Sequence, residues 1–233
     1  MIRGDVSGLH RIRNPYPGRI VMIGLIGRLI VLVTAMTGRS APSKERQYRL
    51  EIGSVRAVPL DPNTPPDPHR HYLALINDDR VLVGGNGAQT EEIIAVYRSD
   101  KSFSDAIRLM EPEDEQYRTA RISVAYHPQA EVLHLGIVRN QGENPETDRL
   151  HVSYQLGEVN DRTLLVLTTY QDGNPNAPYQ GEPEAIPYEG DPSMIAKWLY
   201  GQLDPETRVA VAAMTYNLDT ENVEYQAYPP FTA

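Results

Sequence analysis

The longest apolar segment of the chain, residues 20–36, reads IVMIGLIGRLIVLVTAM. Valine and isoleucine dominate it, which favours strands over a helix. Arg28 interrupts the segment, which is also shorter than the roughly 20 clean apolar residues that a membrane-spanning helix needs. We therefore predict a hairpin of two strands, 19–25 and 28–36, that turns near Gly27. Both strands are apolar on both faces, so other layers should cover them.

Shorter apolar or alternating segments predict further strands, and three segments carry helical signals. Thr90 is expected to cap a helix with Glu91 and Glu92 in its first turn. Asp191 is expected to cap another helix, which begins with Pro192 and runs to about Leu203. The remaining predicted elements are a helix at 103–109 and strands at 51–58, 71–77, 81–84, 121–127, 131–138, 149–156, 162–169, 209–216 and 222–227.

Five segments lack such patterns and are predicted to be irregular. They are 1–15, 37–49, 59–70, 139–148 and 171–192. We interpret residues 1–15 as a loose leader before a single domain at 16–233. The 59–70 segment holds five prolines, which remove ladder donors and disfavour helix. Strands that follow one another as hairpins, with a few helices outside them, indicate an α+β fold of mainly antiparallel sheets.

Charge and composition narrow the function classes. The formal net charge is −9, from 22 basic and 31 acidic side chains in 233 residues. An acidic surface repels a nucleic-acid backbone, so we expect no nucleic-acid partner, whereas a small phosphorylated ligand needs only a few local arginines. Cysteine is absent, which excludes disulfides, a thiol nucleophile and zinc–thiolate sites. Since no signal-peptide pattern is present, we expect a cytoplasmic protein with no membrane partner.

The motifs of several well-known chemistries are missing. The six histidines show no HExxH or comparable spacing, so no metal site is predicted, and there is no GxSxG elbow or Walker loop. Instead, polar turns stand at predicted strand ends, at 37–40, 85–90 and 119–121. The glycines at 84–87 favour a turn with positive φ. Each turn offers an arginine or amide groups, and arginine suits bidentate recognition of phosphate or carboxamide.

Taken in order, these segments resemble the archaeal-type IMP cyclohydrolases. That family opens on a Tyr-x-Gly-Arg motif, which stands here at residues 16–19. Its later motifs resemble Thr37-Gly38-Arg39-Ser40-Ala41-Pro42, Asn86-Gly87-Ala88-Gln89-Thr90, an acidic stretch at 111–114 with Thr119-Ala120-Arg121-Ile122, and Thr168-Thr169-Tyr170 with Gly181-Glu182-Pro183. The resemblance covers about residues 16–215. The chain departs from it in Ala120, which replaces a proline, and in longer segments after Ser40, at 139–148 and at 171–190.

The resemblance implies an αββα four-layer sandwich, similar to N-terminal nucleophile hydrolases but without a processed nucleophile. It also implies ring closure of 5-formamidoimidazole-4-carboxamide ribotide to IMP, with loss of water and no cofactor. The implied partner is a small purine ribonucleotide, and a homo-oligomer is left open. The catalytic candidates are Arg39, Asn86, Glu113 and Tyr170. The substrate-binding candidates are Arg19, Ser40, Gly87, Thr90 and Arg121.

Roles follow from the chemistry that the resemblance implies. Arg39, with Asn86, is expected to polarise the formyl or carboxamide oxygen. Glu113 or a nearby acid is expected to act as general base, and Tyr170 as the acid for the departing hydroxyl. Two other hypotheses stay open: a non-catalytic purine-nucleotide-binding protein on the same scaffold, and an amide hydrolase with another substrate.

Overall fold

The computed structural model describes residues 7–112, 119–141 and 144–231, and two antiparallel sheets dominate it. The six-stranded sheet has the order β13-β10-β1-β2-β14-β15. Its strands are β1 (Arg19–Ile26), β2 (Leu29–Thr37), β10 (Thr163–Thr168), β13 (Glu184–Pro187), β14 (Arg208–Asn217) and β15 (Val223–Tyr228). The seven-stranded sheet runs in chain order, β3-β4-β5-β6-β7-β8-β9. Its strands are β3 (Arg46–Glu51), β4 (Ser54–Pro59), β5 (Leu73–Asn77), β6 (Leu82–Gly85), β7 (Arg121–His127), β8 (Val132–Gln141) and β9 (Asn144–Gln155).

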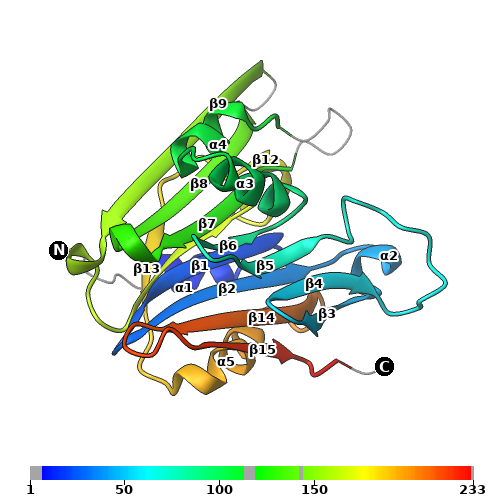
Figure 1. The fold of residues 1–233 in the computed structure, drawn as a ribbon. Helices are drawn as coiled ribbons and strands as arrows, with labels where there is room; N and C mark the ends of the chain where they lie inside the picture. The colour runs from blue at the N-terminus through cyan, green and yellow to red at the C-terminus, as the bar shows by residue number, and fades with distance from the viewer. Residues whose placement is uncertain (1–6, 113–118, 142–143, 232–233) are drawn as a thin grey trace.

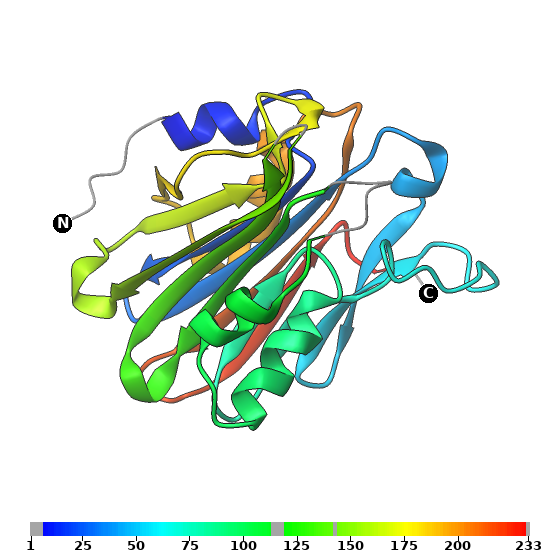
Figure 2. The same ribbon diagram turned by 90° about the horizontal axis from the view of Figure 1, so that it is seen from above.

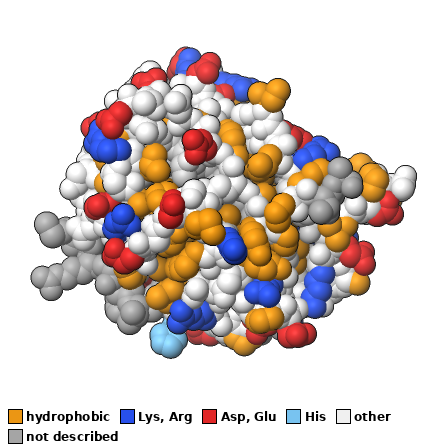
Figure 3. Space-filling model, turned by 90° about the horizontal axis from the view of Figure 1, so that it is seen from below, with side chains coloured by type: hydrophobic (Ala, Val, Ile, Leu, Met, Phe, Trp, Pro, Cys, Tyr) orange, Lys and Arg blue, Asp and Glu red, His pale blue; other side chains and the backbone are white. Residues whose placement is uncertain are grey.

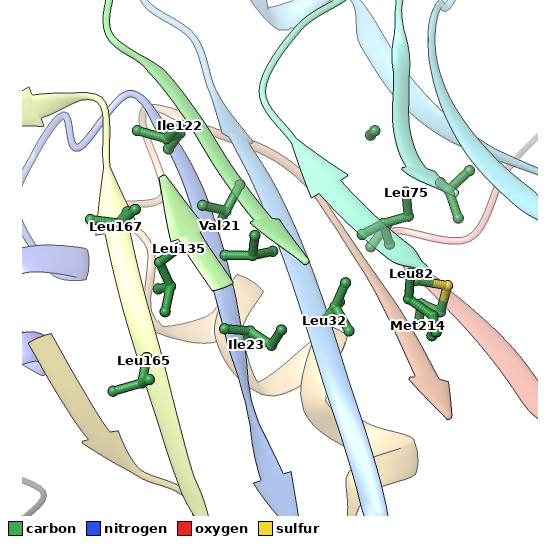
Figure 4. Packing of buried hydrophobic residues seen from close by; sticks show 14 of the residues in the cluster. Val21, Ile23, Leu32, Leu75, Leu82, Ile122, Leu135, Leu165, Leu167 and Met214 are labelled. Carbon is green, nitrogen blue, oxygen red and sulfur yellow. The ribbon is translucent and has the colours of Figure 1, made fainter. Parts of the chain in front are cut away.

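The predicted hairpin at 19–36 is confirmed as β1 and β2, and its continuous apolarity has a clear cause. Successive strand residues point to opposite faces. Val21 and Ile23 therefore enter the core between the two sheets, whereas Ile20 and Met22 enter a second core on the outer face. Figure 4 shows the inner core, with Leu32, Leu165 and Leu167 from one sheet facing Leu75, Leu82, Ile122 and Leu135 from the other.

Helices cover the outer faces of both sheets, so the layers follow the order helix, sheet, sheet, helix (Figures 1 and 2). On the six-stranded sheet lie α1 (Ser7–Ile12) and α5 (Ile195–Gln202), through Ile12, Ile195 and Leu199. On the seven-stranded sheet lie α3 (Gln89–Arg98) and α4 (Phe103–Leu109). Within the described residues, no helix is long and apolar enough to cross a membrane. The face seen from below mixes hydrophobic side chains with charges of both signs (Figure 3).

Four of the segments predicted to be irregular contain regular structure. Residues 7–12 of the expected loose leader form α1, which the fully buried Ile12 holds against the sheet. The sequence did not predict this helix because six residues are too few to show a helical period. The expected loop at 139–148 belongs largely to β8 and β9, where Arg139 and Asp148 lie opposite one another and form an ion pair. Polar residues pair well across strands, so polarity alone did not mark a loop.

The expected long loop at 171–192 holds two further strand pairings. A short hairpin joins β11 (Tyr170–Gln171) to β12 (Asn174–Pro178), and β13 pairs with β10. Asp191 caps as predicted, although it opens a 3-10 turn, Pro192–Met194, before α5. Two other 3-10 turns, Pro128–Ala130 and Leu156–Glu158, follow β7 and β9.

Two boundaries near the predicted site also differ from expectation. A turn at Ile52 and Gly53 interrupts the strand predicted at 51–58, most of which is β4. The preceding strand, β3, begins at Arg46, inside the segment that was expected to be irregular. Just before β3 stands α2 (Ala41–Lys44). Thr90 does not cap α3, because that helix begins at Gln89 and Ala88 holds the capping position, two residues before the predicted cap.

Candidate active site

A polar cavity of about 330 Å³ lies where the ends of several strands and loops meet. Antiparallel pairing sets the start of β1 beside the ends of β2 and β10, since Arg19 pairs with Met36 and Ile20 with Thr168. The loop at 60–72 projects from the same end of the molecule as α2 (Figures 1 and 2). The lining residues are Tyr16, Arg19, Thr37, Arg39, Ser40, Pro42, Ser43, Arg46, Asp67, His69, Arg70, Thr119 and Tyr170.

Gly18 fixes the backbone at the entrance to β1. Its φ is +79°, in the left-handed region, and an added Cβ would overlap the Thr169 hydroxyl. The Thr37 hydroxyl donates to the Gly18 carbonyl at 2.6 Å, and the Arg19 N–H donates to the Thr169 hydroxyl at 3.1 Å. Three chain segments far apart in sequence are thereby tied together, so the glycine of the Tyr-x-Gly-Arg motif has a steric reason.

Two tyrosines and an arginine form a stack along the cavity. The Tyr16 and Tyr170 rings are stacked, with centroids 5.5 Å apart and planes inclined by 25°. The Arg39 guanidinium lies over the Tyr16 ring, 4.6 Å from its centroid, a cation–π contact. The Tyr170 hydroxyl lies 3.3 Å from the Thr119 hydroxyl, within hydrogen-bond reach. Arg39 is exposed and Tyr170 is buried, so the stack runs from the surface inward.

Positive charge dominates the cavity. Of the lining residues that the structure describes, four are arginines and one, Asp67, is an acid. Arg70 forms an ion pair with Asp67. Burial alone would raise the pKa of Asp67, but the hydrogen bonds from Arg70 and from the His69 N–H have the larger combined effect and lower it. Arg19 donates to the His69 carbonyl at 2.8 Å. The arginines therefore keep an excess of positive charge, which suits an anion such as a phosphate.

Arg46 is the most deeply placed of these arginines. It begins β3 and is 4% exposed. Its Nε donates to the Ser43 carbonyl at 2.9 Å. Burial, and secondly the nearby charge of Arg19, lower the pKa of Arg46.

The Asn86 motif forms a neighbouring cluster that does not line the cavity. Asn86 is buried, and its Nδ2 donates to the Ala120 carbonyl at 2.9 Å. Its Oδ1 accepts the Ile122 N–H at 2.9 Å and a hydrogen bond from the Gln89 amide. The Asn86 amide is thus engaged at both ends, and it ties the turn before α3 to the start of β7.

The glycine turn differs from the expected positive-φ turn. Gly84, Gly85 and Gly87 all avoid the left-handed region. At Gly85 the requirement is close approach, because an added Cβ would lie 2.5 Å from the Thr90 hydroxyl oxygen. That hydroxyl is fully buried and donates to the Gly87 carbonyl at 3.2 Å.

Arg121 joins the two groups of residues through the chain. Thr119 lines the cavity, Ala120 accepts from Asn86, and Arg121 Nη1 lies 3.5 Å from the Gln89 side-chain oxygen. Arg121 Nε is buried and has no hydrogen-bond partner among the residues that the structure describes. Ala120, which replaces the proline of the resemblance, is itself fully buried.

The structure therefore divides the predicted site residues into three groups. Arg19, Arg39, Ser40 and Tyr170 meet in the cavity. Asn86, Gly87, Thr90 and Arg121 lie in the neighbouring cluster, and Glu113 lies outside the described residues. The sequence prediction missed eight lining residues that carry polar or aromatic groups: Tyr16, Thr37, Ser43, Arg46, Asp67, His69, Arg70 and Thr119.

Signals for the missed residues were uneven. Tyr16 and Thr119 stand inside motifs of the family resemblance, and Arg46 lies four residues after the motif at 37–42. The residues of the proline-rich loop had no motif to mark them. Among the described residues no three acidic or histidine side chains are grouped to hold a metal, and His71 instead accepts the Asp67 N–H at 3.1 Å.

Three other hollows are larger, and the two largest, each of about 590 Å³, are weaker candidates. One is walled by five prolines and shares Pro42, Asp67 and Arg70 with the cationic cavity, so it adjoins the same site. The other lies at the turn between α3 and α4, where Phe103 and His134 line it. Neither gathers the convergent donors that fix a ligand's orientation.

Comparison with known protein families gives a match over most of the chain. The model of a family described as "IMP cyclohydrolase-like protein" matches residues 16–221. No curated protein matches the chain. The matched range contains every residue that lines the cavity.

Proposed function

Because the chain belongs to the IMP cyclohydrolase-like family, we propose that it closes the purine ring of IMP. The substrate is 5-formamidoimidazole-4-carboxamide ribotide, and the products are IMP and water. The observation that carries the proposal is the cationic cavity, to which the segments 16–19, 37–42, 119–122 and 168–170 all contribute. We also propose that the layered fold is related to the N-terminal nucleophile hydrolases, which its order of sheets and helices supports.

The size and chemistry of the cavity suit a mononucleotide. Its volume of about 330 Å³ is at the small end of ligand pockets, which span roughly 300–1,000 Å³. The arginines take the phosphate, with Arg19 and Ser40 among its ligands. The Tyr16–Tyr170 stack offers aromatic surface to the imidazole ring. Asn86, Gly87, Thr90 and Arg121 act by holding the start of β7, which directly follows Thr119 and Ala120 in the chain.

The reaction needs positioning and proton transfer. The carboxamide nitrogen attacks the formyl carbon, a C–N bond forms, and the resulting carbinolamine loses its hydroxyl as water. Both groups belong to one molecule, so holding them at attack distance lowers the barrier. Arg39 stabilises the oxygen on which negative charge develops.

Proton transfer needs an acid and a base. Tyr170 protonates the departing hydroxyl, and the Thr119 hydroxyl, 3.3 Å away, orients it. Glu113 remains the proposed base that takes the carboxamide proton.

The test is incubation of the purified protein with the formamido ribotide, followed by the absorbance of IMP. Arg39→Ala should abolish turnover and keep the thermal unfolding temperature, because Arg39 is exposed. Arg49→Ala is the matched control, since Arg49 is an exposed arginine on β3 that pairs with Glu51 outside the cavity. Unchanged kcat in Arg39→Ala contradicts its role. Nucleotide binding by the wild type without turnover supports a non-catalytic binding protein instead.

A further inference from the structure

Arg46 holds a charge that no described acid neutralises. The residue is only 4% exposed, and it lines the cavity. Its Nε donates to a backbone carbonyl, while Nη1 is buried and has no hydrogen-bond partner within the described part of the chain. The ion pairs among the described residues include none to Arg46. A guanidinium stays protonated even when burial lowers its pKa, so the charge is permanent.

Such a group is costly in a folded protein. Burying an ion without a partner costs several kcal/mol, and Arg19 nearby adds repulsion. Burial raises the pKa of Tyr48, so this buried neighbour of Arg46 stays neutral and does not offset its charge. An anion from solution is the partner that would lower this cost.

The groups around Arg46 indicate which anion. Arg19 supplies a second guanidinium, and the Ser40 and Ser43 hydroxyls, 2.8 Å apart, line the same cavity. Two cations with hydroxyl donors match a dianion with several acceptor oxygens better than a single carboxylate. Arg46 is buried whereas Arg39 and Ser40 are exposed, so Arg46 marks the inner end of the cavity and Ser40 lies towards its mouth.

We propose that Arg46, together with Arg19, is the principal binding group for a phosphate monoester dianion at the buried end of the cavity. The rest of the ligand, a purine-related ribotide, rests on the proposed function, whereas the phosphate site does not. The site binds inorganic phosphate by the same contacts, so free phosphate competes with a mononucleotide. Arg46 thereby selects phosphorylated ligands over the corresponding nucleosides.

The test measures binding of inorganic phosphate, IMP and inosine by calorimetry, without turnover. Arg46→Gln should weaken binding of phosphate and of IMP by about 10- to 100-fold, as expected for lost charge-assisted hydrogen bonds. Inosine binding should be unchanged. Arg49→Gln, on the same strand but outside the cavity, should bind all three as the wild type does.

Thermal unfolding supplies a second readout. Phosphate should raise the unfolding temperature of the wild type and of Arg49→Gln but not of Arg46→Gln. Without phosphate, Arg46→Gln should unfold no earlier than the wild type, since it removes an unpaired buried charge. If Arg46→Gln does not fold, Arg46→Lys keeps the charge but loses the fork of donors, and it should show an intermediate loss of phosphate binding.

Two results overturn the proposal: no phosphate binding by the wild type, or equal phosphate affinity in the wild type and the folded Arg46 variants. These outcomes are separate from the proposed function. A protein that binds phosphate through Arg46 but never forms IMP keeps the phosphate site and loses the cyclohydrolase assignment. An active cyclohydrolase whose phosphate affinity is the same with and without the Arg46 side chain keeps the cyclohydrolase assignment and loses the phosphate site at Arg46.

Discussion

Replacing Tyr170 with phenylalanine removes one oxygen from the cavity and keeps the ring. The ring retains its stack with Tyr16, 5.5 Å between centroids. The lost hydroxyl lies 3.3 Å from the Thr119 hydroxyl. A neutral hydrogen bond contributes about 1 kcal/mol, so unfolding should shift by only about 2–4 °C in a domain of this size.

The expected effect on turnover is much larger. A positioned general acid contributes about 10²–10⁴-fold in rate, or roughly 3–5 kcal/mol of barrier. Tyr170→Phe should therefore lose kcat by that factor. KM should change little, because the aromatic surface and the arginines that hold the phosphate remain.

Steady-state kinetics of IMP formation, with thermal denaturation of the same samples, checks this expectation. Tyr200→Phe is the matched control, because Tyr200 lies on α5 against Tyr228, outside the cavity. A folded Tyr170→Phe protein with wild-type kcat would refute the role of this hydroxyl as the acid.

Two further predictions concern the fold that supports the site. Gly18→Ala should destabilise the protein by roughly 2–4 kcal/mol, from left-handed strain plus steric overlap, and should lower kcat/KM. Gly27→Ala, where φ is +60° and no atom lies within 4 Å, should cost only about 1 kcal/mol; equal losses in chemical denaturation would contradict the steric argument. Burial, then the charges of nearby histidines, lower the pKa of His134 from 6.5 to about 4, so the unfolded chain binds more protons between these values. The free energy of unfolding should therefore fall by up to roughly 3 kcal/mol as pH drops from 6.5 towards 4. In denaturant titrations at several pH values, His134→Leu should flatten this dependence. The control His10→Asn, at an exposed position, should leave it unchanged.

The sequence predicted elements well where burial was two-sided or a cap was explicit. The β1–β2 hairpin was predictable because nearly every residue enters one core or the other. The helix at 103–109 has the predicted bounds and a capping box at Ser102 and Asp105. β13, by contrast, has four residues and too few apolar positions for a periodic signal.

Site residues were predictable only as far as motifs marked them. The segment RQYRLE of β3 looks polar, yet Arg46 and Tyr48 alternate inward and are buried, which depends on the sheet that packs over them. Asn86 looked free to bind a ligand, whereas its amide is engaged by β7 and Gln89. Local sequence gives neither the depth of a side chain nor the partners that a distant strand brings to it.

The most direct test of the central claim is the rate at which the purified wild-type protein forms IMP from 5-formamidoimidazole-4-carboxamide ribotide. The proposed function predicts many turnovers per protein molecule, with kcat/KM on the order of 10⁴ M⁻¹ s⁻¹ or higher, and loss of this rate in Arg39→Ala but not in Arg49→Ala. Ring closure no faster than in buffer, by a protein that is folded and binds IMP, would contradict it.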